Sequence, residues 1–468
     1  MPTWTNARTP AEFREVELAA AAECRALADE LTGMVLKSIV ANVEFQTEVS
    51  VAARQGGKLR LGARRGVTVT LLGGSQVHLE NLEYLKPNHR RRRRGRPRSK
   101  RGPGGSGVYP CLAALGICFG VTSALACEIC AQVADSDSVR AGRAALGRRG
   151  IDLGHKQTLR IVNAFSARAV AQREQWLQEA RESRPTKGIL AGKRVVVATD
   201  GGRIRERVRH VGRRRKNGHH GFDAPWREPK LLVIYVVDAK GRVEQEFRPI
   251  YDGTLGDCDA VFAMLVGYLR AMGAHQAKQL MILGDGAKWI WDRAPELAAK
   301  VGIDPSKLVE VVDYYHAAET LHDIAGIPSD WKTGEKRKWL RTAKRLLYDG
   351  KTADLVDHIR SIAKGRRAKK ISSHIDYFER NEHRMQYRSF AARHIPRGSG
   401  AVESAMRRII NLRMKSNAKF WNECNAEGMI LLRSYLKAGR FDDLVDWSTA
   451  QAATWHPQYA ASTPIADA

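Results

Sequence analysis

Two short apolar runs in the second half of the chain each end in an aspartate that is followed by glycine. The first, RVVVAT, occupies 194–199 and leads into Asp200, and the second, QLMILG, occupies 279–284 and leads into Asp285. Runs of β-branched and small apolar residues of this length, bounded by glycine, predict strands that are buried on both faces. If the two strands are neighbours, their aspartates lie at the same edge of one sheet, close enough to share a divalent metal ion.

The pattern around these runs predicts further strands and helices. Residues 230–251 predict two strands around a turn at 238–241, residues 257–274 and 295–301 predict helices, and residues 307–313 predict a fifth strand. This order, β, β, β, α, β, α, β, is that of the ribonuclease H-like fold, in which the first strand is central and pairs with the fourth. We expect an α/β core with a mixed five-stranded sheet over 191–317, with Asp200 beside Asp285 and with structural turn positions for Asp238 and Asp252.

A helical and basic stretch, 318–395, follows the fifth strand and is interpreted as an insertion, after which the core resumes at 396–440 and a tail covers 441–468. The segment GSGAVES predicts a helix that begins near Ala401. Glu403 lies at the border of its apolar side, and Arg407 and Asn411 follow it at i+4 and i+8. The apolar arc is formed by Val402, Ala405, Met406, Ile409 and Leu412.

The N-terminal part predicts an accessory module over 1–85, with amphipathic helical spacing at 11–42 and a hairpin around Gly73 and Gly74. Residues 86–107 are too basic and too rich in Pro and Gly to pack, which indicates a linker. Within it, the run Arg94-Gly-Arg96-Pro-Arg98 resembles an AT-hook, whose arginines enter a narrow A·T-rich minor groove. A basic tether that binds phosphates without sequence preference is the alternative.

Residues 108–190 are expected to be helical. The stretch 148–164 resembles a helix-turn-helix, in which Lys156, Thr158 and Arg160 project into a DNA groove, although a purely structural helix pair has the same pattern. The apolar stretch 111–134 predicts two short buried helices rather than a membrane span, because polar residues and a GVTS break interrupt it. Cys127 and Cys130 are spaced like half of a zinc site, but no second such pair lies nearby.

The composition indicates what kind of partner the protein binds. The 468 residues contain 78 Lys and Arg against 50 Asp and Glu, a net charge of +28, and much of the excess is clustered. Such a surplus favours a polyanion, and Arg213, Arg214 and Arg215 form one of the clusters. The seven cysteines are scattered and odd in number, which indicates reduced thiols in the cytosol. The first residues have no apolar signal core.

Taken together, these motifs resemble those of the DDE transposases of bacterial insertion sequences, in particular the Mutator-like types with a helical insertion before the catalytic Glu. The likeness covers about residues 108–440. It is carried by Asp200-Gly201, Asp285-Gly286 with Trp289, Asp313-Tyr-Tyr-His316, GSGAVES with Glu403, and the segment RMKSNAKFWNECNAEGMILLRSYL. One departure is that the basic segment at 86–107 stands where relatives are expected to carry a cysteine zinc knuckle.

The resemblance implies a metal-dependent enzyme that cleaves and joins DNA phosphodiesters. Asp200, Asp285 and Glu403 would be the catalytic triad and hold two ions of Mg²⁺ or Mn²⁺, since hard cations prefer oxygen ligands. Asp313 competes with Asp285 for the second position, and His316 either positions a carboxylate or caps the insertion helix. Arg407 is an accessory candidate.

The implied partners are double-stranded DNA, both the element ends and the target, and further copies of the chain in the DNA complex. The implied location is the bacterial cytoplasm, at the nucleoid. Two alternatives stay open: a transposase-derived DNA-binding protein without catalysis, and a ribonuclease H-like nuclease without strand transfer.

Overall fold

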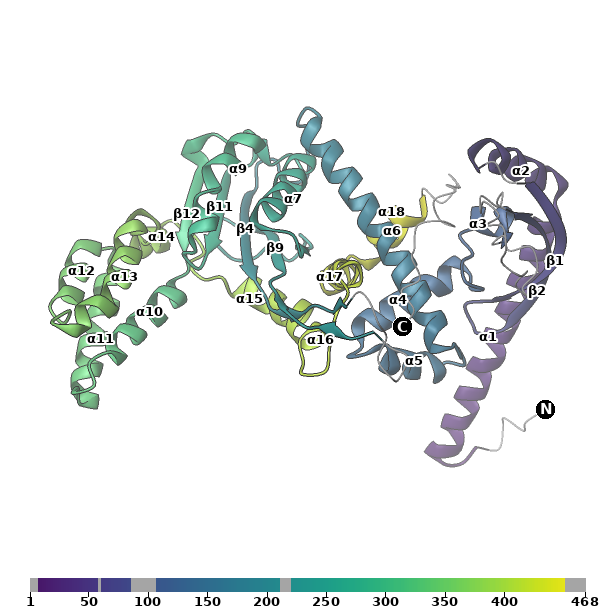
Figure 1. Ribbon diagram of the computed structural model, residues 1–468, viewed down its shortest axis with the longest axis horizontal. Coiled ribbons are helices and arrows are strands. Elements are labelled where there is room, and N and C mark those ends of the chain that lie inside the picture. Colours follow the sequence, from purple (N-terminus) through teal and green to yellow (C-terminus); the bar gives the residue numbers. More distant parts are fainter. Residues whose placement is uncertain (1–6, 58–59, 86–106, 211–219, 451–468) are drawn as a thin grey trace, which may run out of the picture. The chain divides into compact units, whose positions relative to one another are not determined.

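The computed structural model describes residues 7–57, 60–85, 107–210 and 220–450 (Figure 1). The chain divides into two compact units, one formed by Met1–Arg168 with Asp442–Ala468 and the other by Ala169–Phe441. In the described residues, no helix is both long and apolar enough to cross a bilayer.

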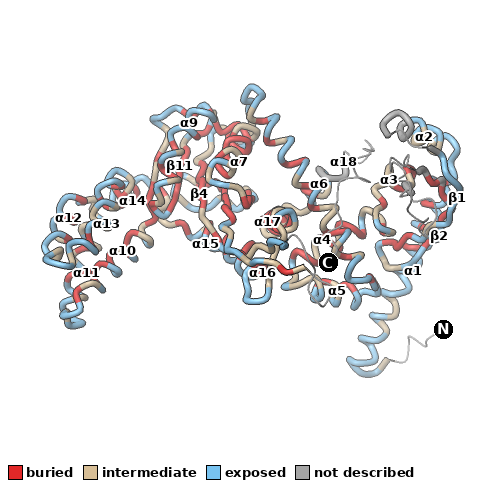
Figure 2. The backbone as a smooth tube through the Cα atoms, in the orientation of Figure 1, coloured by how far each residue is buried: buried red, intermediate tan, exposed pale blue. Residues whose placement is uncertain are grey.

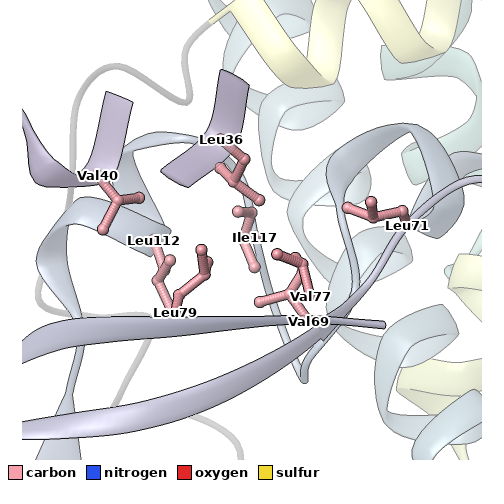
Figure 3. Close-up of a cluster of buried hydrophobic side chains, with 8 residues drawn as sticks. All are labelled: Leu36, Val40, Val69, Leu71, Val77, Leu79, Leu112 and Ile117. Atoms are coloured by element: carbon pink, nitrogen blue, oxygen red, sulfur yellow. The ribbon is translucent and has the colours of Figure 1, made fainter. Parts of the chain in front are cut away.

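The first unit begins with two helices and a hairpin. Helix α1 (Pro10–Ala41) starts with a capping box between Thr9 and Glu12, and α2 (Val43–Gly57) follows it. Strands β1 (Arg60–Thr70) and β2 (Gln76–Leu85) pair antiparallel, and Gly74 in their turn has φ of +102°, which favours glycine. Figure 3 shows the apolar core that joins α1, the hairpin and α3, formed by Leu36, Val40, Val69, Leu71, Val77, Leu79, Leu112 and Ile117.

The rest of this unit is helical after the short strand β3 (Gly107–Val108), which pairs with β2. Its helices are α3 (Pro110–Ala114), α4 (Ser123–Asp135), α5 (Val139–Gly147) and α6 (His155–Glu182), the last of which continues into the second unit. The apolar stretch at 111–134 therefore forms two short helices with a break between them. Cys127 and Cys130 are buried as free thiols in α4.

The second unit contains the expected mixed five-stranded sheet, in the order β10-β9-β4-β11-β12. Strand β4 (Arg194–Gly201) is central, antiparallel to β9 (Lys230–Val237) and parallel to β11 (Gln279–Gly284). Strand β9 pairs antiparallel with β10 (Ile250–Thr254), and β11 pairs parallel with β12 (Leu308–Val312). The strands are buried along almost their whole length (Figure 2), so helices cover both faces of the sheet.

Two expectations about this sheet were wrong. The second strand of the 230–251 pair begins at Ile250, well after the Asp238–Gly241 turn, because the polar stretch 238–249 has too little apolar surface to continue the ladder. Asp252 therefore lies inside strand β10 and not at a turn, and its side chain is fully buried. Asp238 is at the turn as expected, where it forms an ion pair with Arg242.

Asp252 is the centre of a buried polar cluster that joins four elements. It accepts hydrogen bonds from Arg173 Nη1 of α6 at 2.9 Å and from the Tyr268 hydroxyl of α7 (Cys258–Ala271) at 2.6 Å. Glu427 of α17 (Glu423–Lys437) completes the cluster, 3.8 Å from Arg173 and bonded to the Thr254 hydroxyl. Because Arg173 is 2 % exposed and Asp252 is 0 % exposed, this pair replaces the hydration that each charge loses on burial.

Short helices α8 (Lys288–Trp291) and α9 (Ala294–Val301) lie between β11 and β12. After β12 the chain forms a run of helices that separates the strand from the Glu403 segment: α10 (Tyr314–Gly326), α11 (Thr333–Tyr348), α12 (Thr352–Arg360), α13 (Arg366–Arg380) and α14 (Tyr387–Ala392). Helix α15 (Gly400–Met406) then packs on β4 and β9.

Helix α15 continues through a π-helical turn, Arg407–Asn411, into α16 (Leu412–Met414). A π turn contains one extra residue and rotates the side chains that follow it. Consequently the predicted apolar arc is wrong at its end: Ile410 is buried, whereas Leu412 is 55 % exposed. Val402, Ala405, Met406 and Ile409 are buried as expected.

Candidate active site

The sheet register places three aspartates in one row. Ala198 of β4 aligns with Leu283 of β11, and Leu283 aligns with Val311 of β12. Two residues further along each parallel strand are Asp200, Asp285 and Asp313, at the carboxyl ends of neighbouring strands that lie about 4.8 Å apart. The structure thus brings Asp200 beside Asp285, as the strand order predicts.

Asp285 is exposed and lies in a tight turn. Its carboxylate accepts a hydrogen bond from the Ala287 amide at 2.9 Å, and Gly286 has φ of +92°. The Tyr377 hydroxyl of α13 donates to the carbonyl oxygen of Asp285 at 3.3 Å. A Cβ atom at Gly286 would come within 2.4 Å of the Tyr377 ring, so glycine is required there by both backbone and space.

Asp313 has a different environment from the other two aspartates. Its side chain is fully buried, and its Oδ1 accepts from the amides of Tyr315 at 2.5 Å and His316 at 3.1 Å, which caps α10. Its Oδ2 accepts from the Ser399 amide, which precedes α15. All three bonds position backbone, at the start of α10 and before α15, whereas the carboxylate of Asp285 is exposed.

Glu403 lies in the first turn of α15 and points partly into solvent, with its side chain 53 % exposed. Its Oε1 accepts from the Ser399 hydroxyl at 2.8 Å and lies 3.8 Å from Nε2 of His316. Because Asp313 holds both the start of α10 and the Ser399 amide, it fixes the two elements that carry His316 and Glu403.

The carboxylate of Asp200 is affected electrostatically by its neighbours. Burial raises the pKa of Asp200, and a hydrogen bond from the Gly201 amide opposes this shift. The negative charges of Asp285 and Glu403 raise the Asp200 pKa further, while His316 lowers it. Asp200 therefore lies within electrostatic reach of all three side chains, which come from the turn after β11, from α15 and from α10.

This donor set suits a hard divalent cation. It consists of carboxylate oxygens, which Mg²⁺ and Mn²⁺ prefer, and the mutual repulsion that raises the Asp200 pKa would be relieved by a positive charge placed among them. In the described part of the chain, no three Asp, Glu, His or Cys side chains converge closely enough to form a complete ligand shell.

The remaining predicted residues fall into two groups. Arg407 is exposed, one turn beyond Glu403, and Lys156 and Arg160 are exposed on α6 one turn apart. Thr158 was expected beside them but is fully buried, and its hydroxyl donates to the Gly154 carbonyl at 3.1 Å, since it faces the interior side of α6. The other predicted DNA-binding residues lie outside the described residues: Arg94, Arg96, Arg98, Arg213, Arg214 and Arg215.

Two contributors to the site were not identified from the sequence. Ser399 lies four residues before Glu403 within GSGAVES, so a helical-turn argument could have paired their side chains. Tyr377 lies in the helical insertion, 92 positions from Asp285, and nothing local to either residue indicates the contact.

Comparisons with protein-family models, with curated proteins and with solved structures give no match for this chain.

Proposed function

We propose that this protein is a DDE transposase with a ribonuclease H-like core, which cleaves and joins DNA phosphodiesters by using Asp200, Asp285 and Glu403. The observation that carries the proposal is that Asp200 and Asp285 both lie just beyond the last paired residues, Ala198 and Leu283, of adjacent parallel strands, and that Glu403 acts on Asp200 from a helix more than a hundred residues away in sequence. The sheet order, with two antiparallel and two parallel pairings around central β4, supports the ribonuclease H-like assignment.

The chemistry follows from the kind of side chains present. The three carboxylates would hold Mg²⁺ or Mn²⁺, which supplies an activated oxygen nucleophile and stabilises charge on the leaving oxygen. In the first step a water oxygen bonds to phosphorus while the bond to the 3′ oxygen breaks, which leaves a 3′-hydroxyl and a 5′-phosphate. In the second step the oxygen of that 3′-hydroxyl bonds to a target phosphorus while the bond from this phosphorus to its own 3′ oxygen breaks, which joins the two strands and leaves a free 3′-hydroxyl on the target.

Neighbouring residues of the chain hold the proposed catalytic side chains in position. Asp313 and Ser399 fix the start of α15 and the rotamer of Glu403, and Tyr377 covers the turn that presents Asp285. Nε2 of His316 lies 3.8 Å from Oε1 of Glu403, close enough to help orient the carboxylate. The net charge of +28 favours binding of the DNA that these groups act on.

Plasmid nicking tests the proposal. We expect the wild-type protein to nick supercoiled DNA with Mg²⁺, and Asp200→Asn, Asp285→Asn and Glu403→Gln each to lower the rate at least about a hundredfold, since charge stabilisation by bound metal contributes several kcal/mol. Asp238→Asn is the matched control. Asp238 follows Val237, which pairs with Arg194 at the opposite end of β4, so its charge lies far from the site.

A strand-transfer assay separates the related activities. A labelled duplex with free 3′-hydroxyl ends should become joined to a target plasmid. Nicking without joining would indicate a nuclease, and undiminished nicking by all three triad variants would refute the assignment of the site.

A further inference from the structure

A narrow β-ribbon leaves the sheet directly after Asp200 and returns to it at β9. Its first pair is β5 (Ile204–Arg205) with β8 (Trp226–Arg227), and its second pair is β6 (Val208–Arg209) with β7 (Phe222–Asp223), both antiparallel. The Gly202 amide donates to the Pro229 carbonyl at 2.8 Å and closes the base of the ribbon. The tip, 211–219, lies outside the described residues. The first strand of the ribbon thus begins four residues after Asp200, a proposed catalytic carboxylate.

The ribbon is fixed to the segment that follows the Glu403 helix. The Trp421 amide donates to the Arg205 carbonyl at 2.9 Å, and the Arg207 amide donates to the Trp421 carbonyl at 2.8 Å. The Trp421 indole in turn donates to the carbonyl of Met414 in α16 at 3.0 Å. These bonds give the ribbon a defined orientation relative to α15 and α16.

Arginines occupy every second position on one strand of the ribbon, at 203, 205, 207 and 209. Alternate residues of an extended chain share a face, and two of these arginines contact aromatic rings of the facing strands. The Arg205 guanidinium lies 4.9 Å from the centre of the Trp226 ring, and Arg207 lies 4.7 Å from that of Phe222. Within the described residues, no carboxylate forms an ion pair with Arg203, Arg205 or Arg207, whereas Arg227 pairs with Glu206.

Trp226 is a large aromatic residue that is not buried: it is 53 % exposed. Arg205 covers one face of its ring and restricts its orientation, while more than half of the residue stays in contact with water. Exposed tryptophan beside unpaired arginines is the combination with which proteins bind single-stranded nucleic acid, since arginine binds phosphates and any base can stack on an indole.

We propose that this arginine face, with Trp226, binds an unpaired stretch of DNA next to the carboxylates. Arg203, Arg205 and Arg207 contact phosphates, and an unstacked base packs on Trp226. The inference rests on the proposed function and deepens it, because it assigns to the site a substrate with a single-stranded segment at the strand being cut. The ribbon's attachment to α16 links occupancy of this face to the helix that carries Glu403.

Fluorescence anisotropy in EDTA tests the proposal without cleavage. The probes are a labelled single-stranded oligonucleotide and a blunt duplex of the same sequence. We expect Trp226→Ala to weaken single-strand binding by about tenfold to a hundredfold and Trp226→Phe to recover most of it. Arg203→Ala should reduce the slope of log affinity against log salt by about 0.7.

Two matched controls separate a local effect from a general one. Arg242→Ala removes an exposed arginine at the opposite end of β9, and Phe13→Ala removes an aromatic side chain of α1 that is 58 % exposed. Neither should alter single-strand binding, and the midpoint of thermal unfolding should be the same for Trp226→Ala and wild type because Trp226 is largely exposed.

The outcomes distinguish the ribbon from the enzyme. Equal single-strand affinity of Trp226→Ala and wild type would overturn the proposed DNA-binding face, even if the wild-type protein nicks plasmid. Conversely, loss of binding in Trp226→Ala together with no Mg²⁺-dependent nicking by wild type would retain the binding face and overturn the proposed transposase activity. A loss of the same size for the duplex probe would also contradict a role for base stacking.

Discussion

Removal of the Asp313 carboxylate should unfold the connection between β12, α10 and the start of α15. The carboxylate is 0 % exposed and accepts three backbone hydrogen bonds, from Tyr315, His316 and Ser399. A hydrogen bond to a charged acceptor contributes about 1.5–3 kcal/mol. The sum overestimates the loss, because Asp313→Ala also removes a charge that is costly to bury, so we expect a loss of about 3–5 kcal/mol in the free energy of unfolding.

Urea denaturation followed by circular dichroism measures this loss, and Asp304→Ala is the matched control. Asp304 caps the short helix before β12 by accepting from the Ser306 amide at 2.9 Å, but it is exposed. Its removal should cause only a small change in the denaturation midpoint. Asp313→Asn keeps one acceptor for the α10 cap but places an amide NH₂ group against Ser399 N–H, so its stability should lie between those of wild type and Asp313→Ala.

The same variants report on the site. Asp313→Asn should lower plasmid nicking while the protein stays folded at the assay temperature, because Ser399 and hence Glu403 lose their fixed position. If Asp313→Ala is no less stable than Asp304→Ala, the buried cap does not hold these elements together and the assignment of Asp313 as a positioning residue is wrong.

Three further outcomes are expected. Arg173→Met should lower the free energy of unfolding by about 3–5 kcal/mol in urea titrations, because it leaves Asp252 buried without its cation. Adding Asp252→Leu should restore much of this loss. A double variant that is no more stable than Arg173→Met would contradict the reasoning. Burial, reinforced by neighbouring charges, raises the pKa of Asp200, so folding loses stability as pH rises from the unfolded toward the folded pKa. Asp200→Asn should therefore raise the thermal midpoint in EDTA at neutral pH but not at acid pH, and an unchanged midpoint at neutral pH would be inconsistent with a strained carboxylate site. Burial raises the pKa of Cys127 to about 11, so a thiol reagent at pH 7.5 should label exposed Cys24 rapidly and Cys127 only after denaturation, as peptide mass spectrometry can determine.

The sequence predicts the central part of the sheet well because the signals there are local. Uninterrupted apolar runs before Asp200 and Asp285 indicate buried strands, and the order of elements indicates that the two strands are neighbours; the mixed five-stranded sheet is confirmed. The place of Glu403 beside His316 and Asp200 follows from no local pattern. It depends on packing between segments that lie far apart in the chain.

The features that the sequence did not predict have separate physical causes, none of which leaves a local pattern. A π turn after Met406 exchanges Leu412 for Ile410 in the core, and no sequence period reveals where a helix takes up an extra residue. The ribbon after Asp200 has strands of only two residues, too short for an alternation signal. Asp252 is buried only because Arg173 is available from another helix to neutralise it.

The contact between Tyr377 and the turn at Gly286 restricts which cores and helical insertions can be combined in one chain. A core and a helical insertion taken from two different proteins could each fold correctly and still be incompatible, because any side chain at 286 would collide with the tyrosine ring. Chimaeras should therefore exchange both positions as a unit. Grafts that exchange the insertion alone should succeed only when the donor insertion has a tyrosine at the position of Tyr377, so that its hydroxyl can donate to the carbonyl of Asp285.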